Sequence, residues 1–281
     1  MTPVIAIVAS GAMGSGVAKR LTEHDVKVVT VLNGRSAASR ARAADAGMVA
    51  VSPEALVEAD LLLSIVPPAN ALSFAEQTAF ALKSARRKPV FVDCNAVNPA
   101  TVRHIHAVIS ATGTDFVDGG IIGFPPVPGT QTGPRLYVSG EHAAKVSVLN
   151  QHGLDVRVLD GPVGAASALK MAYAGISKGH IAIMAAMLLA AERSGSSKAL
   201  RDELTASEPH LMATMGRRVP GMFPKAYRWV AEMEEIAEFA RDDPAAREMW
   251  TNIARLYERL ARDMAGDKTE IDALARFFTE R

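Results

Sequence analysis

The sequence predicts an α/β fold, with an N-terminal Rossmann-type, doubly wound parallel sheet followed by an all-α C-terminal domain. Short apolar runs alternate with segments of helical periodicity through the first half of the chain, as right-handed βαβ crossovers require. Near Gly161 the strand patterns stop and long amphipathic segments take over. The 281 residues also exceed the usual length of one domain. We therefore expect two domains, residues 1–160 and 161–281.

The expected elements follow the chain in that order. The clearest strands are expected at residues 4–8, 26–32, 61–66 and 90–92, with helices at 13–23, 36–46 and 69–82. Three further strands, at 116–118, 136–139 and 156–159, extend the sheet, and a Gly- and Pro-rich connection fills 119–134. The second domain should contain helices at 165–194, 197–215, 225–241 and 244–264.

Composition excludes several classes of protein. An apolar fraction of 49% with 22% charged residues excludes a disordered chain. The 31 basic and 30 acidic residues give almost no net field, so we expect a small-molecule substrate and neither nucleic acid nor a membrane as partner. Cys94 is the single cysteine, and residues 1–10 lack a secretory signal pattern, which predicts a cytoplasmic protein. The most apolar stretch, 181–191, is about half of a membrane span and reads as a buried helix.

A glycine turn follows the first expected strand. Its sequence, Ser10-Gly11-Ala12-Met13-Gly14, departs from the dinucleotide-binding fingerprint because Ala9 stands at the first glycine position. Gly11 would let the backbone approach a pyrophosphate, and Gly14 would let the helix pack on the strand. The helix N-terminus would attract the anion. We expect Ser10, Gly11, Ala12 and Met13 to bind a cofactor, and an ordinary glycine-rich turn is the alternative.

The end of the second expected strand indicates which dinucleotide binds. An acidic residue there would hold the ribose 2′-hydroxyl of NAD, but this chain has Asn33-Gly34-Arg35-Ser36. Arg35 can offer a planar fork to a 2′-phosphate and stack on adenine, while Asn33 and Ser36 can donate hydrogen bonds. NADP is therefore the predicted cofactor. The alternative is that Arg35 is a solvated residue at a helix start.

Three further segments, taken with the glycine turn, carry a family resemblance. They are Val66-Pro67-Pro68, the stretch 93–99 and the stretch 161–170, each in the expected order along the chain. Over roughly residues 4–178 the chain resembles the β-hydroxyacid dehydrogenase superfamily, which includes 6-phosphogluconate and 3-hydroxyisobutyrate dehydrogenases. The resemblance implies hydride transfer between NADP(H) and a hydroxy or carbonyl metabolite, in which a hydroxy acid is one option. It also implies an active site in the cleft between the domains and a homodimer formed through the C-terminal helices.

The resemblance assigns roles to particular residues. Lys170 would be the acid/base, because a cation near the reacting oxygen stabilises the alkoxide and supplies its proton. The alternative is a lysine whose head reaches water from an amphipathic helix. Asn95, Val66 and Pro67 would lie against the cofactor, and Asn95 would also orient the reacting groups. An asparagine that stabilises the turn before Pro99 is the alternative for Asn95.

Two departures from the family bear on the substrate. Gly120, Ile121, Ile122 and Gly123 cover the family's substrate-carboxylate loop, and Ile122 replaces its serine, which disfavours a simple β-hydroxy acid. Ala174 replaces an asparagine that usually lies one helical turn after the lysine.

The substrate loop, together with residues 136–140, is closer to imine reductases. Those enzymes typically have aspartate or tyrosine where this chain has Lys170, which favours carbonyl chemistry instead. Imine reduction therefore stays an alternative function, and a non-catalytic NADP-binding or sensor protein is another.

The second domain offers fewer signals. Arg228, Glu232 and Glu235 share a helical face and would form either a polar substrate wall, in which Glu235 contacts substrate, or a surface ion-pair ladder. Lys178, two turns after the proposed acid/base, is expected to face solvent. Gly175 and Gly179 would permit close backbone contact with a partner element. We predict no metal site, because His104 and His106 lack companions at ligand spacing.

Overall fold

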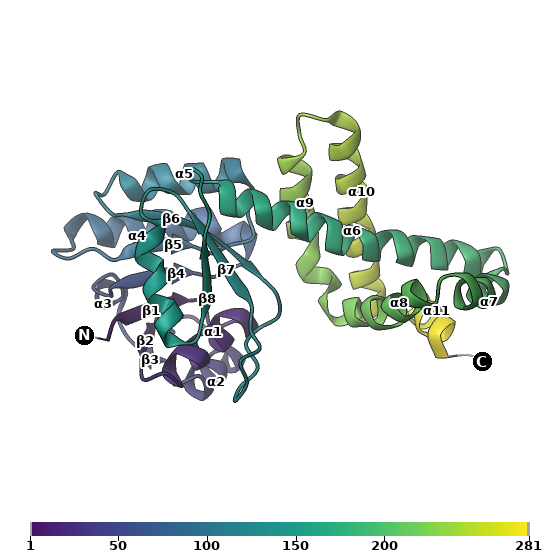
Figure 1. Ribbon diagram of the computed structural model, residues 1–281, viewed down its shortest axis with the longest axis horizontal. Helices are drawn as coiled ribbons and strands as arrows, with labels where there is room; N and C mark the ends of the chain where they lie inside the picture. The colour runs from purple at the N-terminus through teal and green to yellow at the C-terminus, as the bar shows by residue number, and fades with distance from the viewer. Residues whose placement is uncertain (1, 280–281) are drawn as a thin grey trace. The chain divides into compact units, whose positions relative to one another are not determined.

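The computed structural model describes residues 2–279 and divides into two compact units, Met1–Met171 and Ala172–Arg281 (Figure 1). The first unit contains the sheet and its covering helices, and the second is helical. The division falls inside helix α6 (Ala165–Arg193), whereas the sequence placed the domain boundary before that helix.

The sheet of the first unit has eight strands in the order β3-β2-β1-β4-β5-β6-β7-β8. Their bounds are β1 Val4–Val8, β2 Lys27–Thr30, β3 Val49–Ala50, β4 Leu61–Ser64, β5 Val90–Asp93, β6 Phe116–Ile122, β7 Arg135–Ser139 and β8 Asp155–Val158. The six strands from β3 to β6 are parallel, and the order reverses beside β1. The predicted doubly wound sheet is therefore confirmed, and its reversal point is where such folds bind ligands.

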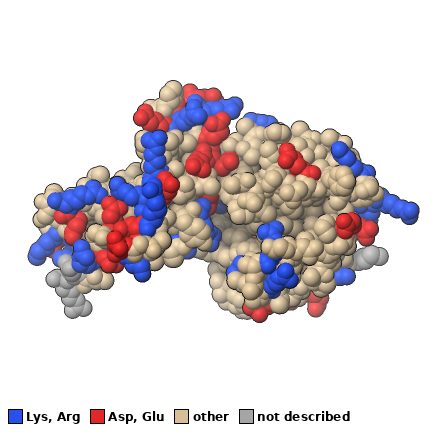
Figure 2. All heavy atoms as spheres, turned by 180° about the vertical axis from the view of Figure 1, so that it is seen from behind, with Lys and Arg blue, Asp and Glu red and all other residues tan. Residues whose placement is uncertain are grey.

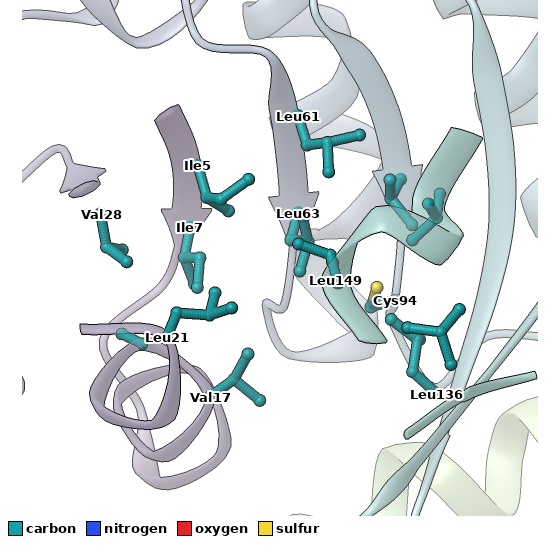
Figure 3. Packing of buried hydrophobic residues seen from close by; sticks show 14 of the residues in the cluster. Ile5, Ile7, Val17, Leu21, Val28, Leu61, Leu63, Cys94, Leu136 and Leu149 are labelled. Carbon is teal, nitrogen blue, oxygen red and sulfur yellow. The ribbon is translucent and has the colours of Figure 1, made fainter. Parts of the chain in front are cut away.

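Two apolar layers cover the sheet because successive strand residues point to opposite faces. Ile5 and Ile7 pack with α1 (Ala12–Thr22), α2 (Ala37–Asp45) and the 3₁₀ segment η2 (Ala143–His152). Figure 3 shows Ile5 and Ile7 beside Val17 and Leu21 of α1. On the other face, Ala6 and Val8 pack with α3 (Pro53–Leu56), α4 (Ala71–Ser84) and α5 (Pro99–Ser110), and the short 3₁₀ turn η1 (Pro68–Asn70) leads into α4.

Strand β6 is longer than the sequence predicted. The glycines after Asp118 were read as the start of a long connection, but Gly119 and Gly120 pair with Val138 and Tyr137 of β7. The connection is consequently residues 123–134. It contains no helix, and β7 therefore runs antiparallel to β6 instead of returning by a βαβ crossover. Strand β8 is parallel to β7 and ends the sheet.

The second unit contains the rest of α6 and the helices that follow it. These are α7 (Ser197–Ser207), α8 (Pro209–Met222), the 3₁₀ turn η3 (Phe223–Lys225), α9 (Ala226–Phe239), α10 (Pro244–Ala265) and α11 (Thr269–Thr279). The single helix expected over 197–215 is two helices, because Pro209 lacks an N–H group and starts a new one. A Cβ at Gly179 would lie 2.5 Å from Trp250 of α10, so the predicted close contact exists.

Helix α6 is long and apolar enough to cross a membrane by length and composition. However, 56% of its most apolar window is buried, as in the core helix of a soluble protein. On the face drawn in Figure 2, basic and acidic side chains are densely interspersed over the helical unit and sparse over the α/β unit. No large field of one sign covers either unit on that face, in keeping with the near-zero net charge.

Candidate functional site

The glycine turn lies at the carboxyl end of β1. Gly11 is the N-cap of α1, and a Cβ built there would meet no atom within 4 Å, so the space in front of it is open. At Gly14 a Cβ would collide with the carbonyl oxygen of Ala9, which explains the glycine as a helix–strand contact. The start of α1 has no side-chain cap and no acidic residue in its first turn. An anion such as a pyrophosphate fits this helix end.

A hydrogen-bond network ties the glycine turn to α2. The buried Ser10 hydroxyl donates to the carbonyl oxygen of Ser39 at 3.0 Å. Arg42 donates to the carbonyl of Ser10 at 2.9 Å and to the hydroxyl of Ser39 at 3.0 Å. The side chain of Ser10 is therefore used within the protein, and a cofactor would meet its main chain. Sequence reasoning missed Arg42, whose only signal was its place on the helix after the turn.

The turn between β2 and α2 is exposed and basic. Asn33, Arg35 and Ser36 lie in this turn, and the exposed Ser36 hydroxyl caps α2 by accepting from Ser39 N. The side chain of Arg35 makes no hydrogen bond or ion pair within residues 2–279. Arg40 donates from its guanidinium to the carbonyl of Arg35 at 3.1 Å. No acidic residue lies in the first turn of α2, so a phosphate would meet no repelling carboxylate there.

Asn95 lies just beyond β5 and is 2% exposed. Its amide oxygen accepts from Val66 N at 2.7 Å, and its amide nitrogen donates to Ser64 Oγ and Asp93 Oδ2, both at 2.9 Å. The amide therefore fixes the ends of β4 and β5 and the main chain before Pro67. Its predicted contact with cofactor and substrate stays a prediction. The bonds give the side chain a structural role, but at the ends of β4 and β5 and not in the turn before Pro99.

The buried groups around Asn95 are electrostatically unusual. The pKa of the Asp93 carboxyl is raised to about 7, mainly by burial and also by the charge of Asp118. Two hydrogen bonds from Asn95 lower this pKa but do not offset the effect of burial. Burial also raises the pKa of the Cys94 thiol well above its usual value. Figure 3 shows Cys94 among apolar side chains, as a small buried hydrophobe.

Lys170 reaches the predicted substrate segment at the end of β6. Its Nζ donates to the carbonyl oxygen of Ile121 at 2.7 Å. Gly120, Ile121 and Ile122 are the last residues of the strand, and both isoleucines are buried, at 7% and 6% exposure. Gly123 follows with φ of +127°, a conformation that favours glycine. The structure thus brings the predicted acid/base and the predicted substrate segment together.

The site residues predicted in the helical unit are less well supported. Ala174 is 2% exposed and offers no polar side-chain atom, and Glu235 is half-buried. The expectation that Lys178 faces solvent was wrong. Its side chain is 15% exposed, forms an ion pair with Glu232 and lies 5.3 Å from the ring centroid of Trp229. Glu232 therefore pairs with α6, whereas the expected ladder would have paired it along its own helix.

Arg20 is a buried arginine that sequence reasoning missed. It is 5% exposed and its guanidinium donates to four main-chain carbonyls. Three belong to the connection 123–134, at Val127, Thr130 and Thr132, and the fourth belongs to Gly153. The connection after the substrate segment is thereby held on α1. Within residues 2–279, no group of three or more His, Cys, Asp or Glu side chains could hold a metal ion.

Comparison with known proteins places the chain in a family. The model of the NAD-binding domain of 6-phosphogluconate dehydrogenase matches residues 4–153, and a domain of unknown function, DUF1932, matches residues 191–260. An uncharacterised 28.5 kDa protein from Methanothermus fervidus is 28% identical over 217 residues, which cover 76% of this chain and 82% of that protein.

Solved structures share the whole architecture. A conserved protein of unknown function, described as structurally similar to 3-hydroxyacid dehydrogenases, is 29% identical with a TM-score of 0.69, over 93% of this chain and 98% of its own. The 3-hydroxyisobutyrate dehydrogenase of Mycobacterium tuberculosis, solved with L-serine, has 21% identity and a TM-score of 0.68 over 100% of both chains. Imine reductases have the same fold.

These matches agree with the glycine turn, the strand order and the helical second unit described above. The first unit is the NAD(P)-binding domain of an oxidoreductase. The chain belongs to the family of the 6-phosphogluconate dehydrogenase NAD-binding domain, within the β-hydroxyacid dehydrogenase superfamily.

Proposed function

We propose that this protein is an NADP-dependent oxidoreductase that transfers hydride between NADP(H) and a hydroxy or carbonyl metabolite, with Lys170 as acid/base. One observation carries the proposal. The amine of Lys170 is bonded to the carbonyl of Ile121, at the carboxyl end of a strand in the unit that binds the dinucleotide. A proton donor is thereby fixed beside the segment predicted to hold the substrate.

The reduced nicotinamide supplies the hydride when the cofactor is bound. The protein must then stabilise the negative charge that grows on the substrate oxygen as the hydride arrives, and Lys170 is the residue proposed for this role. An ammonium carries three N–H donors, so the bond to Ile121 fixes the group through one of them. In reduction the ammonium form stabilises the developing alkoxide, gives it a proton and becomes the neutral amine; in oxidation the neutral amine accepts the hydroxyl proton.

The preference for NADP over NAD rests on the basic turn after β2. A 2′-phosphate carries negative charge that an acidic residue would repel, and this turn presents Arg35 with Arg40 beside it. Arg42 adds a third guanidinium, fixed between the glycine turn and α2 by its bonds to Ser10 and Ser39. These features support recognition of the phosphate that distinguishes NADP from NAD.

An assay of hydride transfer tests the function. Purified protein is mixed with NADPH or NADH and a panel of ketones, oxo acids and cyclic imines, and consumption of the reduced nicotinamide is followed. We expect turnover of a carbonyl with NADPH. Lys170→Ala should lower kcat about 10²- to 10⁴-fold, the range of general acid–base catalysis, while NADPH affinity stays unchanged.

Lys198→Ala is the matched control, since that lysine is 78% exposed and forms an ion pair with Asp202 one turn along its own helix. It should leave kcat unchanged. Full activity in Lys170→Ala would remove the proposed mechanism. Binding of NADPH without hydride transfer to any member of the panel would favour the non-catalytic alternative.

Imine reduction is the second candidate. The observation that favours it is Ile122, a buried apolar residue where the family has a serine that anchors the substrate carboxylate. A larger or less acidic substrate could bind beside isoleucine at this position, because it would not need the serine hydroxyl. Faster turnover of cyclic imines than of ketones in the same panel would select this function over carbonyl reduction.

We also propose a homodimer formed through the helices of the second unit. Tyr173, Ile176, Ile183 and Met187 of α6 are 51 to 76% exposed and lie at helical spacings, so they form one apolar stripe. A stripe of this kind on a helix is typical of an interface. Light scattering should give a dimer mass for the native protein and a monomer mass for Ile176→Asp combined with Ile183→Asp.

A further inference from the structure

A buried carboxylate lies where α6 meets the sheet. Asp118, in β6, is 0% exposed and accepts four hydrogen bonds. Its donors are Ser139 Oγ at 2.9 Å, Gly164 N at 2.9 Å, Ser167 N at 3.1 Å and Ser167 Oγ at 2.6 Å. Three of the bonds end on Oδ2, and Oδ1 accepts only from the Ser167 hydroxyl; bonds of this kind are stronger to a charged carboxylate than to a neutral acceptor.

The bonds to Asp118 complete the N-terminus of α6. The first N–H groups of a helix lack intrahelical acceptors and must find others. Here each has one: Gly164 N and Ser167 N donate to Asp118, Ala166 N donates to Ser139 Oγ at 3.0 Å, and Ala165 N donates to the carbonyl of Pro162 at 3.1 Å. The start of α6 is therefore bonded to β6 and β7 by side chains of those strands.

The charge of Asp118 is balanced by the helix itself. Among residues 2–279, the carboxylate forms no ion pair with a lysine, arginine or histidine. It lies instead at the positive end of the α6 dipole, where a negative charge is stabilised. The attachment of α6 to the sheet thus depends on a charge as well as on geometry.

The next residues of β6 bring α6 into direct contact with the strand. A Cβ at Gly120 would lie 2.8 Å from the carbonyl oxygen of Ala166 and 3.2 Å from the Cβ of Lys170. The absence of that side chain lets the helix lie on the strand backbone. The carbonyl of Ile121 then accepts the Lys170 amine at 2.7 Å. Asp118, Gly120 and Ile121 therefore contact the start of α6 at successive points.

We propose that Asp118 is a positioning residue for Lys170. It acts through α6, because it holds Ser167 and Gly164 in place and the lysine projects from the following turn toward Ile121. This inference rests on the proposed role of Lys170 as acid/base. An amide at position 118 removes the negative charge from the positive end of α6 and weakens the single oxygen that accepts from Gly164 N and Ser167 N, so the turn that carries the lysine would shift.

The experiment compares Asp118→Asn with Asp115→Asn. Asp115 carries an exposed carboxylate just before β6 and bonds to Lys145 and His142, so it controls for the change of charge. The measurements are kcat, KM for the carbonyl substrate, Kd for NADPH and the pH profile of kcat, each corrected for the folded fraction by circular dichroism.

A displacement of about 1 Å costs up to about 100-fold in rate, so Asp118→Asn should lower kcat about 10- to 100-fold. Its pH profile should shift, because the amine loses its fixed environment, and Kd for NADPH should stay unchanged. Asp115→Asn should match the native protein in every measurement.

A second variant keeps the test decisive if Asp118→Asn does not fold. Gly120→Ala places a methyl group against Ala166 and moves α6 away from β6 without altering any charge. It should reproduce the fall in kcat and the unchanged NADPH affinity. Native kcat and pH profile in either folded variant, while Lys170→Ala is inactive, would overturn this inference alone. Native activity in Lys170→Ala would overturn the proposed function instead.

Discussion

Two sets of polar side chains in the α/β unit differ in burial and in hydrogen bonding to the protein's own main chain. Asp118, Asn95 and Arg20 are 0 to 5% exposed, and each makes at least one hydrogen bond to main-chain groups distant in sequence. Arg35 and Arg40, in the turn after β2 and the helix that follows, are exposed, and Arg35 has no side-chain partner within residues 2–279. The buried set determines where main-chain segments lie, whereas the exposed set is accessible to a ligand.

The largest expected effect is the pH dependence of stability that comes from Asp93, a buried carboxyl bonded to Asn95 of the buried set. The pKa of Asp93 is about 7 in the folded protein, against an ordinary aspartate value of 3.8, so the folded state keeps a proton that the unfolded state loses. The free energy of unfolding should therefore fall as pH rises from about 4 to 7, by about 4 kcal/mol. Urea unfolding from pH 4 to 8 should show this fall, and Asp93→Asn should lack it.

A substitution of Arg20 tests whether the hydrogen bonds of a buried side chain to the main chain contribute to the stability of the fold. Arg20→Ala removes four main-chain hydrogen bonds and, within residues 2–279, leaves the carbonyls of Thr130 and Gly153 without a donor, so the free energy of unfolding should fall by about 3 kcal/mol. Arg40→Ala, at the exposed turn, should change it by less than about 0.5 kcal/mol. Equal losses in the two variants, measured by urea unfolding, would erase the distinction between the sets.

Asn95 separates the structural from the catalytic interpretation. Asn95→Ala leaves Val66 N without its acceptor, which should cost about 2 kcal/mol of unfolding free energy. If the amide is structural, kcat for the folded protein should change little. A large fall in kcat with unchanged stability would instead support the predicted role in orienting the reacting groups and would move Asn95 out of the buried, backbone-holding set.

The smallest expected effect is that of Arg35→Ala, which should change only the affinity for NADPH. Arg35→Ala should weaken NADPH binding by about 1 kcal/mol, roughly 5- to 10-fold in Kd, because a charge-assisted bond to the 2′-phosphate is lost at an exposed site. Binding of NADH and the free energy of unfolding should stay as in the native protein. Fluorescence titration with both cofactors makes the measurement, and an equal loss for NADH would argue against recognition of the phosphate.

Much of the fold could be predicted because its signals are local. The alternation of apolar runs and helical periods predicted β1, β4 and β5 within a few residues. Strand β6 was predicted too short, since Gly119 and Gly120 have low strand propensity and are held there by pairing with β7. The break before Pro209 had a local signal that the amphipathic pattern around it obscured.

The residues of the candidate site also differ in whether a local sequence pattern could predict their role. Gly11 and Arg35 could be predicted as cofactor-binding residues because the prediction depends on neighbours a few residues away in a motif, and both stay predictions. Asp118 bonds to residues 46 and 49 positions later, and Arg20 to carbonyls 107 to 133 positions later. No local pattern marks such partners, so their roles became visible only in three dimensions.

The way Arg20 holds the connection 123–134 bears on how that segment can evolve. All three contacts are with carbonyl oxygens, which every residue type possesses. Exchanges at Val127, Thr130 or Thr132 would leave the arginine's acceptors in place. The side chains of this loop can therefore change while its path stays the same, which suits a segment that follows the residues predicted to bind substrate.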